Sequence, residues 1–157
     1  MVPDLGNEEL RAIEEILDSG QLVEGARAHE FEELISQKAG AKHTVVCTSA
    51  TVGLELALKA LNLEPGDEVV LPAFTHPATV LSVMNVGLAP VLVDVDPKAF
   101  NTNAELLAQG LSHKTKVLMP VSWGGYPLDM APIMALAGKH GLSVIEDAAC
   151  SLGTSYD

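Results

Sequence analysis

The residues with the clearest chemical potential lie in Val144–Ala149, where an apolar run ends on the acids Glu146 and Asp147. In an open α/β sheet, ligands bind beside the carboxyl ends of the buried parallel strands. An unpaired charge is costly to bury, so Asp147 requires a hydrogen-bonding or cationic partner. The pattern favours a ligand with a protonated ring nitrogen, although a turn cap or an internal ion pair would also explain it. The chain has two arginines, which weakens the case for an arginine partner.

A second candidate is the turn Thr48–Gly53, which leads from an expected strand directly into an expected helix. Free backbone amides and the positive end of the helix dipole favour a phosphate group there, and Ser49 and Thr51 add hydroxyl donors. An ordinary helix cap explains the same residues, because serine and threonine are common at caps. The chain has neither the Walker pattern nor the G-x-G-x-x-G pattern, which disfavours ATP and dinucleotides.

Three further residues follow the ends of expected strands. His76 presents a flat ring that could cover a ligand face, although by itself it is more readily interpreted as a surface or capping histidine. Trp123, the only tryptophan in the sequence, is either a core residue or the wall of a cleft. Cys150 lies close to Asp147 in the chain, where a plain buried thiol is a simpler interpretation than a reactive one.

Apolar, β-branched runs alternate with helical patterns along the chain. The expected strands are residues 44–48, 68–72, 90–94, 116–121 and 142–146. The expected helices are residues 8–17, 28–38, 51–61 and 129–139, with two more that begin after His76 and at a capping box in residues 102–105. Asn7 is expected to cap the first helix and Gly20 to end it. The first two helices should form a peripheral layer.

This alternation predicts a parallel, doubly wound α/β sheet that is covered by helices on both faces, because each expected strand is a nearly continuous apolar run. No internal repeat, low-complexity stretch or domain linker is visible in residues 1–157, so one domain is expected. The sequence stops soon after the fifth expected strand without a helix to cover it, which suggests part of a longer domain.

Composition narrows the functional classes. Hydrophobic residues make up 48% of the sequence, as in folded domains. No apolar run approaches the ~20 residues that cross a bilayer, and the acidic start is unlike a signal peptide, so we expect a cytoplasmic protein with no membrane partner. The formal net charge of −12 disfavours a nucleic-acid partner. The two cysteines and five histidines lack zinc spacing, so no metal is expected.

Taken together, these segments resemble the DegT/DnrJ/StrS sugar aminotransferase family of fold-type I pyridoxal-phosphate (PLP) enzymes. The resemblance covers essentially the whole chain, and the order and spacing of its short motifs make it specific. The motifs are Ser19-Gly20, Gly25, Phe31-Glu32, Ser49-Ala50-Thr51, Pro65 to Val69, Pro72 to Thr75, Pro90 to Asp96, Thr115-Lys116, Ile145 to Ala149 and Leu152-Gly153.

The resemblance implies a three-layer α/β/α fold with a mostly parallel sheet, of which this chain is the amino-terminal part of the large domain, without the carboxyl-terminal small domain. It also implies PLP as the cofactor. Ala50 and Thr51 match the pair that binds its phosphate. His76 matches the ring that stacks on the pyridine, and Asp147 matches the acid that pairs with the pyridine nitrogen. A protonated pyridine is the better electron sink, which gives this acid a chemical purpose.

The chain departs from the family pattern at several positions. Ala50 stands where glycine is usual, Ser122 where histidine is common, and Cys150 where glutamine or histidine contacts the ring oxygen, so no role is carried over to Cys150. The lysine that holds PLP as a Schiff base lies beyond Asp157 in this family. We therefore expect no catalytic residue in this chain, and noncovalent PLP binding at best. The seven lysines that do not match are Lys38, Lys42, Lys59, Lys98, Lys114, Lys116 and Lys139.

The function that the resemblance implies is amino transfer from glutamate or glutamine to a nucleotide-linked keto-sugar, in the biosynthesis of cell-surface polysaccharide or antibiotic sugars. A homodimer, in which a second subunit completes each site, is implied for the full-length enzyme. A related branch dehydrates the sugar and has histidine in place of the lysine, and nothing up to Asp157 separates the branches. A non-catalytic remnant that binds a ligand or partner stays open, whereas a flavodoxin-like domain shares the sheet but not the motif order.

Overall fold

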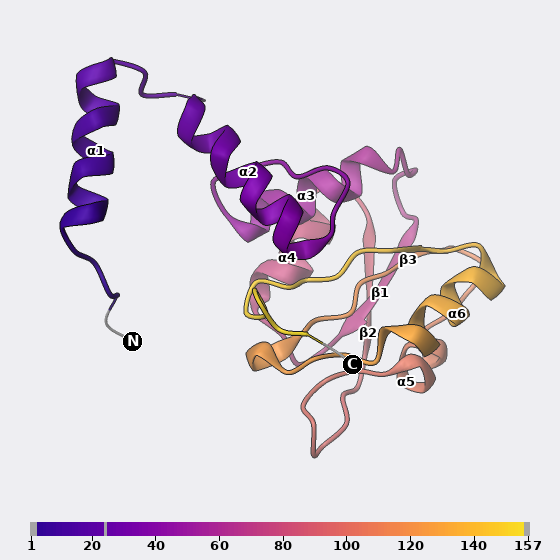
Figure 1. The fold of residues 1–157 in the computed structure, drawn as a ribbon. Helices are drawn as coiled ribbons and strands as arrows, with labels where there is room; N and C mark the ends of the chain where they lie inside the picture. The colour runs from indigo at the N-terminus through magenta and orange to yellow at the C-terminus, as the bar shows by residue number, and fades with distance from the viewer. Residues whose placement is uncertain (1–2, 24, 156–157) are drawn as a thin grey trace. The chain divides into compact units, whose positions relative to one another are not determined.

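A computed structural model describes residues 3–23 and 25–155 of the chain (Figure 1). The chain divides between Val46 and Cys47 into two compact units. The sequence shows no linker composition at this point, so the division was not expected from the sequence.

The first unit contains the helices α1 (Asn7–Ser19) and α2 (Ala26–Ala39). Gly20 ends α1 at φ 68°, a left-handed conformation that glycine adopts without a steric penalty, and this confirms the predicted end. The predicted cap at Asn7 is wrong by one residue. Gly6 holds the cap position, because the Glu9 carboxylate reaches back and accepts a hydrogen bond from its amide at 2.6 Å.

The second unit is built on a parallel sheet with the strand order β2-β1-β3-β4. The strands are β1 (Glu68–Pro72), β2 (Ala89–Val93), β3 (Thr115–Leu118) and β4 (Ser143–Val144). All three strand pairs are parallel, which confirms the predicted sheet type. The described residues form four strands rather than the five that were expected.

The expected strand at residues 44–48 is the one that does not form. Val45 and Val46 are exposed, and no described strand pairs with this segment. The amide of Val46 instead donates to Glu32 Oε1 at 2.8 Å, within the first unit. A β-branched run favours an extended backbone, but a strand also needs a neighbour with free hydrogen-bonding groups, and the chain divides at this segment.

Helices cover both faces of the sheet, as predicted (Figure 1). On one face, Leu54 and Leu58 of α3 (Ala50–Ala60) and Val83 of α4 (Pro77–Asn85) pack with the β1 residues Val69 and Leu71. The opposite face holds a second core of residues from β1, β3, α5 (Ala104–Gln109) and α6 (Met130–His140), namely Val70, Leu107, Leu118, Ile133 and Ala137. Alternate β1 residues therefore enter different cores, which is why Val69, Val70 and Leu71 are all apolar.

The start of α5 corrects another local prediction. Asn103, and not Thr102, caps this helix, and its side chain accepts from the amide of Leu106 at 2.9 Å. The helix therefore starts one residue later than the capping box expected at residues 102–105. Glu105 is the second helical residue, whereas a capping box needs a glutamate at the third to accept from the cap amide. Thr102 is only 4% exposed, and its hydroxyl has no hydrogen-bond partner among the described residues.

Candidate functional site

The polar residues singled out in the sequence gather at the carboxyl edge of the sheet. Thr75 and His76 follow β1, Ser122 and Trp123 follow β3, and Asp147 follows β4. All five line one small cavity. The structure thus brings His76 and Asp147 together, where ligands bind in parallel sheets.

The backbone of Asp147 is fixed as an extension of the sheet. Asp147 pairs in parallel with Val121, beyond the ends of β3 and β4. Its amide donates to the carbonyl of Pro120 at 2.9 Å, and its carbonyl accepts from the amide of Ser122 at 3.1 Å. These bonds fix the backbone of Asp147, so only its side chain can change direction at this edge of the sheet. The residue is only 7% exposed.

The Asp147 carboxylate is buried with neutral partners. Its Oδ2 accepts from the Thr79 hydroxyl at 2.7 Å, and its Oδ1 accepts from the Ala149 amide at 3.2 Å. The ion pairs among the described residues do not involve this carboxylate. A buried carboxylate is most stable opposite a positive charge, and the oxygens of Asp147 still have lone pairs that can accept further hydrogen bonds. The Asp147 carboxylate therefore fits a protonated ring nitrogen as its partner.

His76 is both the cap of α4 and part of the cavity wall. Its Nδ1 accepts from the amide of Ala78 at 3.2 Å, and Pro77 follows at the first helical position. The capping interpretation of this histidine is therefore confirmed. The same contact fixes the ring in place, and because Nδ1 accepts a hydrogen bond, a neutral ring carries its proton on Nε2. A capping role and a place beside a ligand are compatible at this position.

The cavity itself is narrow. Its volume is about 30 Å³. A cavity needs about 10–15 Å³ by this measure to hold one water molecule, so the hollow has room for very few waters and not for a whole pyridine ring. A ring could therefore direct its nitrogen toward Asp147 only from outside this hollow, with the rest of the ring beyond the cavity mouth.

Ala50 and Thr51 form the first turn of α3, next to the cap residue Ser49, and do not line the Asp147 cavity. Ser49 Oγ accepts from the amide of Val52 at 3.3 Å, so the helix-cap interpretation is confirmed for Ser49. The amides of Ala50 and Thr51 precede the first intrahelical bond and point out of the helix start. The end of α3 leads through residues 61–67 into the start of β1, which directs these amides toward the carboxyl edge of the sheet.

Ser122 and Glu146 form a pair beside Asp147. The buried Ser122 hydroxyl donates to Glu146 Oε1, while Glu146 itself is exposed. The first of the two acids in the Glu146-Asp147 motif thus anchors the loop after β3. The second acid faces the cavity.

Sequence reasoning missed Thr79. It is fully buried on α4, and its Oγ1 lies 2.8 Å from Thr75 Oγ1 and 2.7 Å from Asp147 Oδ2. The sequence holds one usable signal, because Thr79 is a hydroxyl residue between alanine and valine at the start of a largely apolar helix. A buried hydroxyl needs a partner. The partner itself lies 68 residues later, which no local pattern reveals.

Three aromatic rings flank the loop that carries His76. Phe74 lies edge-on to Trp123 with ring centroids 5.1 Å apart, and its centroid is 5.6 Å from that of Phe100. Trp123 is half-buried and lines the Asp147 cavity, so of the two alternatives it is a wall residue. The buried Asn101 holds this region by accepting from the Trp123 amide at 2.9 Å and donating to the Tyr126 carbonyl at 3.3 Å.

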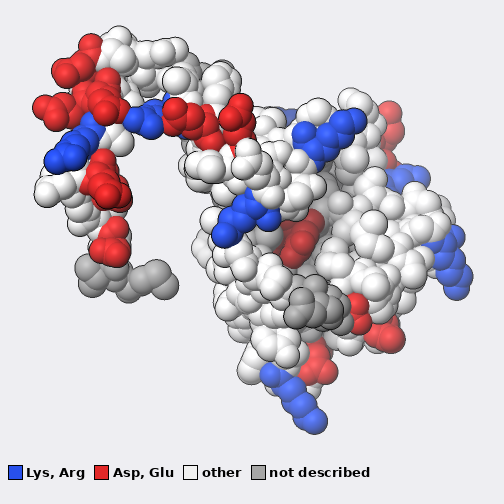
Figure 2. All heavy atoms as spheres, viewed as in Figure 1, with Lys and Arg blue, Asp and Glu red and all other residues white. Residues whose placement is uncertain are grey.

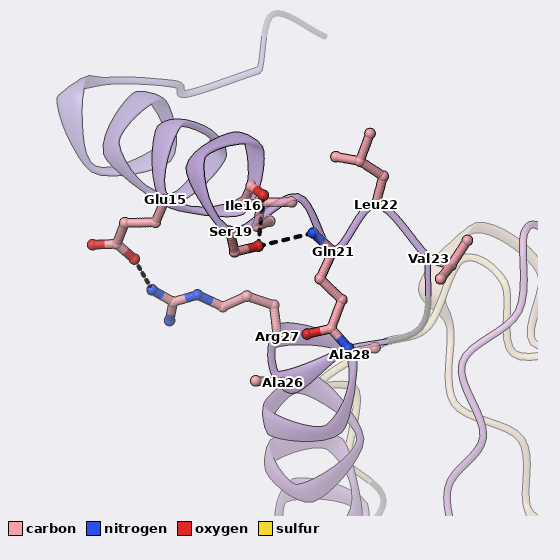
Figure 3. Close-up of a pocket in the computed structure, with 10 residues that line it drawn as sticks. Glu15, Ile16, Ser19, Gln21, Leu22, Val23, Ala26, Arg27 and Ala28 are labelled. Carbon is pink, nitrogen blue, oxygen red and sulfur yellow. Dashed lines mark hydrogen bonds and ion pairs between the residues drawn. The ribbon is translucent and has the colours of Figure 1, made fainter.

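The first unit has a hollow of its own between α1 and α2, with a volume of about 380 Å³ (Figure 3). Arg27 extends beside it and ion-pairs with Glu15 and, at 2.8 Å, with Glu30. The bonds to Glu15 and then to Glu30 raise the pKa of Arg27. Residues 1–46 carry ten of the 21 acidic residues, and Figure 2 shows red spheres crowded on these helices. Arg27 is therefore paired with two acids of its own unit.

Two other kinds of site are absent from residues 3–23 and 25–155. That part of the chain contains no cluster of three or more His, Cys, Asp or Glu side chains arranged to hold a metal ion. It also contains no helix with the length and apolar character needed to span a bilayer.

The sequence model of one protein family spans nearly the whole chain. This model describes the DegT/DnrJ/EryC1/StrS aminotransferase family and matches residues 3–157. The chain belongs to this family. The parallel sheet, the two helical layers and the polar carboxyl edge are therefore features of a DegT/DnrJ/EryC1/StrS aminotransferase fold.

Solved structures of similar proteins agree with this assignment. An aminotransferase from Psychrobacter cryohalolentis is 38% identical, with a TM-score of 0.93 over 98% of this chain and 40% of its own. NtdA from Bacillus subtilis with bound cofactor PMP is 31% identical, with a TM-score of 0.91 over 96% of this chain and 36% of its own. A putative sugar aminotransferase from Streptococcus pneumoniae in its PLP form is 34% identical, with a TM-score of 0.83 over 90% of this chain and 36% of its own. The chain thus spans about two fifths of the length of these family members.

Proposed function

We propose that this chain supplies the cofactor-binding part of a PLP-dependent aminotransferase that acts on a nucleotide-linked keto-sugar in polysaccharide or antibiotic sugar biosynthesis. The observation that carries the proposal is the Asp147 carboxylate, which is buried at the sheet edge with neutral donors and no described cationic partner. Family membership and the PLP and PMP forms of its relatives support it.

Each residue has a specific part in this proposal. Asp147 accepts a hydrogen bond from the ring nitrogen of the cofactor and keeps it protonated. His76, fixed as the cap of α4, covers one ring face, and the free amides of Ala50 and Thr51 receive the phosphate. When bound, PLP supplies an electron sink for a carbanion at the substrate carbon.

The rest of the proposal concerns the whole enzyme. The lysine that binds PLP covalently would be supplied by sequence beyond Asp157, and this chain would bind the cofactor noncovalently at most. The amino-acid donor, the cytoplasmic location and a homodimer that completes each site are proposed from the family resemblance alone. A small carboxyl-terminal domain, absent from residues 1–157, belongs to the same proposal.

Pyridoxamine 5′-phosphate is a suitable probe of the chain, because it has no aldehyde that could react with surface lysines. Its binding can be followed through Trp123, the only tryptophan, which lines the Asp147 cavity. We expect Asp147→Asn to weaken binding by about tenfold to a hundredfold, as is usual when a charged hydrogen bond is lost. Asp94→Asn is a matched control, because Asp94 is an exposed acid that follows the neighbouring strand β2.

Equal affinity of the Asp147→Asn variant and the parent chain for the probe would contradict the proposed cofactor role. Absence of binding in the parent chain would contradict the proposal that its residues by themselves form the cofactor-binding part. Excess inorganic phosphate should compete with the probe, and replacing Thr51 with valine should weaken that competition if the α3 start receives the phosphate.

A further inference from the structure

We propose that Thr79 is a positioning residue that aims Asp147 at the cofactor, through a relay of hydroxyl groups that runs from Thr75 to Thr79 to Asp147. This inference rests on the proposed function, because it concerns the same carboxylate. Thr79 lies on α4, fully buried, and its hydroxyl is within hydrogen-bond distance of Thr75 and of Asp147.

The direction of the relay follows from counting protons. An ionised carboxylate only accepts hydrogen bonds, so the single hydroxyl proton of Thr79 must point to Asp147 Oδ2, 2.7 Å away. The contact of 2.8 Å between Thr75 Oγ1 and Thr79 Oγ1 then has to use the proton of Thr75. Each hydroxyl therefore donates toward the acid, and each donation strengthens the next bond in the chain.

The Thr79 side chain has little freedom to turn away. Its amide donates to the His76 carbonyl at 3.0 Å, which anchors the backbone of this residue in the first turn of α4. Threonine is branched at Cβ, which restricts the side chain further. Oδ2 of Asp147 is consequently held on the α4 side, while Oδ1 is held by the Ala149 amide. The rotation of the carboxylate about its last bond is thereby fixed.

The same turn of α4 carries the second predicted cofactor contact. His76 is the cap of α4 and Thr79 is the third residue of the helix, so three positions separate them and they share one face. A single helical turn thus sets the His76 ring directly and the Asp147 carboxylate through Thr79. The two groups proposed to contact the cofactor are positioned by one rigid element.

The test compares Thr79→Val, which keeps the shape but removes the hydroxyl, with Thr79→Ser, which restores it. With pyridoxamine 5′-phosphate as the probe and Trp123 fluorescence as the signal, we expect Thr79→Val to weaken binding by about tenfold or more and Thr79→Ser to recover most of the affinity. Ser82→Ala is the matched control. It removes a buried hydroxyl from the same helix, but one that donates to the Thr79 carbonyl and not to Asp147.

Two further measurements separate positioning from a general structural defect. Thr79→Val should not change the affinity for the analogue of pyridoxamine 5′-phosphate in which a C–H group replaces the ring nitrogen. In an Asp147→Asn background, Thr79→Val should cause no further loss for pyridoxamine 5′-phosphate. A similar loss for both ligands, or an additive loss in the double variant, would overturn the inference.

The failure of this inference differs from the failure of the proposed function. Normal affinity in Thr79→Val together with weak affinity in Asp147→Asn would overturn the relay and leave the role of Asp147 intact. Normal affinity in both variants would overturn both. If Thr79→Val does not fold, Thr75→Val decides the question, because Thr75 is half-buried and its bond to Thr79 is neutral. We expect it to weaken binding about threefold, and no loss would contradict the relay.

Discussion

Val121 and Asp147 lie opposite each other in a parallel bridge that keeps the register of β3 and β4. The amide of Ile145 donates to Leu118 and the amide of Asp147 donates to Pro120, as in a continuous parallel ladder. The bond missing between them is the one that the amide of residue 120 would make, and proline has no amide hydrogen. A proline thus interrupts the ladder without changing its register, and the sheet still delivers Asp147 to its edge.

The first prediction concerns Gly110, which follows α5. A Cβ atom at this position would lie 2.8 Å from Cγ1 of both Val70 and Val93. Because the core would have to move, we expect Gly110→Ala to lower the free energy of unfolding by about 1–3 kcal/mol in a urea titration. The control is Gly138→Ala in α6, where no atom lies within 4 Å, and it should raise the free energy by about 0.5–1 kcal/mol. Equal stability of the two variants would contradict the packing described here.

A second prediction tests the buried amide of Asn101. It bridges the Trp123 amide and the Tyr126 carbonyl, so Asn101→Ala leaves both groups without this partner. We expect a loss of about 1–3 kcal/mol in unfolding free energy and a shift of the Trp123 emission toward that of a solvated ring. Asn103→Ala removes the α5 cap and should cost about 1 kcal/mol without moving the emission. An unchanged Trp123 spectrum in Asn101→Ala would refute the bridge.

The third prediction concerns the pH dependence of the loop after β2. Hydrogen bonds from the amides of Ala99 and Lys98 hold the pKa of Asp96 below its ordinary value of 3.8. Because the folded-state pKa is the lower one, the stabilisation is complete above the unfolded-state value and is lost as the pH falls through the folded-state pKa. The amide resonances of Lys98 and Ala99 should therefore titrate with a midpoint below 3.8. Asp96→Asn should abolish this transition, and a midpoint above 3.8 would contradict the prediction.

A fourth prediction concerns covalent labelling. All seven lysines are exposed, and the lining of the Asp147 cavity contains none of them. Treatment with PLP and borohydride should therefore label several lysines partially, with no site that pyridoxamine 5′-phosphate protects. Peptide mass spectrometry measures the distribution. Stoichiometric, protectable labelling of one lysine would show that this chain contains the cofactor lysine after all.

The sequence predicted best those features of the fold that depend only on neighbouring residues. The bounds of β1 were predicted correctly, as was the helix end at Gly20, because an apolar run and a left-handed glycine act over a few residues. The errors at Asn7 and Thr102 are shifts of one residue. Both arose because two adjacent residues could serve as the cap and the geometry of the turn selected one of them.

Long-range relationships decided the remaining features. Residues 44–48 have the composition of a strand but no described partner strand, so propensity alone did not produce one. The hydroxyl chain to Asp147 joins residues that are 68 positions apart and needs α4 packed against the sheet. Neither result follows from a window of sequence.

The α/β alternation, the family motifs and the chemical type of each candidate residue can be read from the amino-acid order, because they depend on neighbouring residues and their spacing. Three features depend instead on how the chain packs: His76 and Asp147 share a cavity, Thr79 supports the carboxylate, and Ala50 and Thr51 stand apart from that cavity. Parallel strands bring distant loops to one edge of the sheet, and the packing of the helices then fixes which side chains of those loops meet.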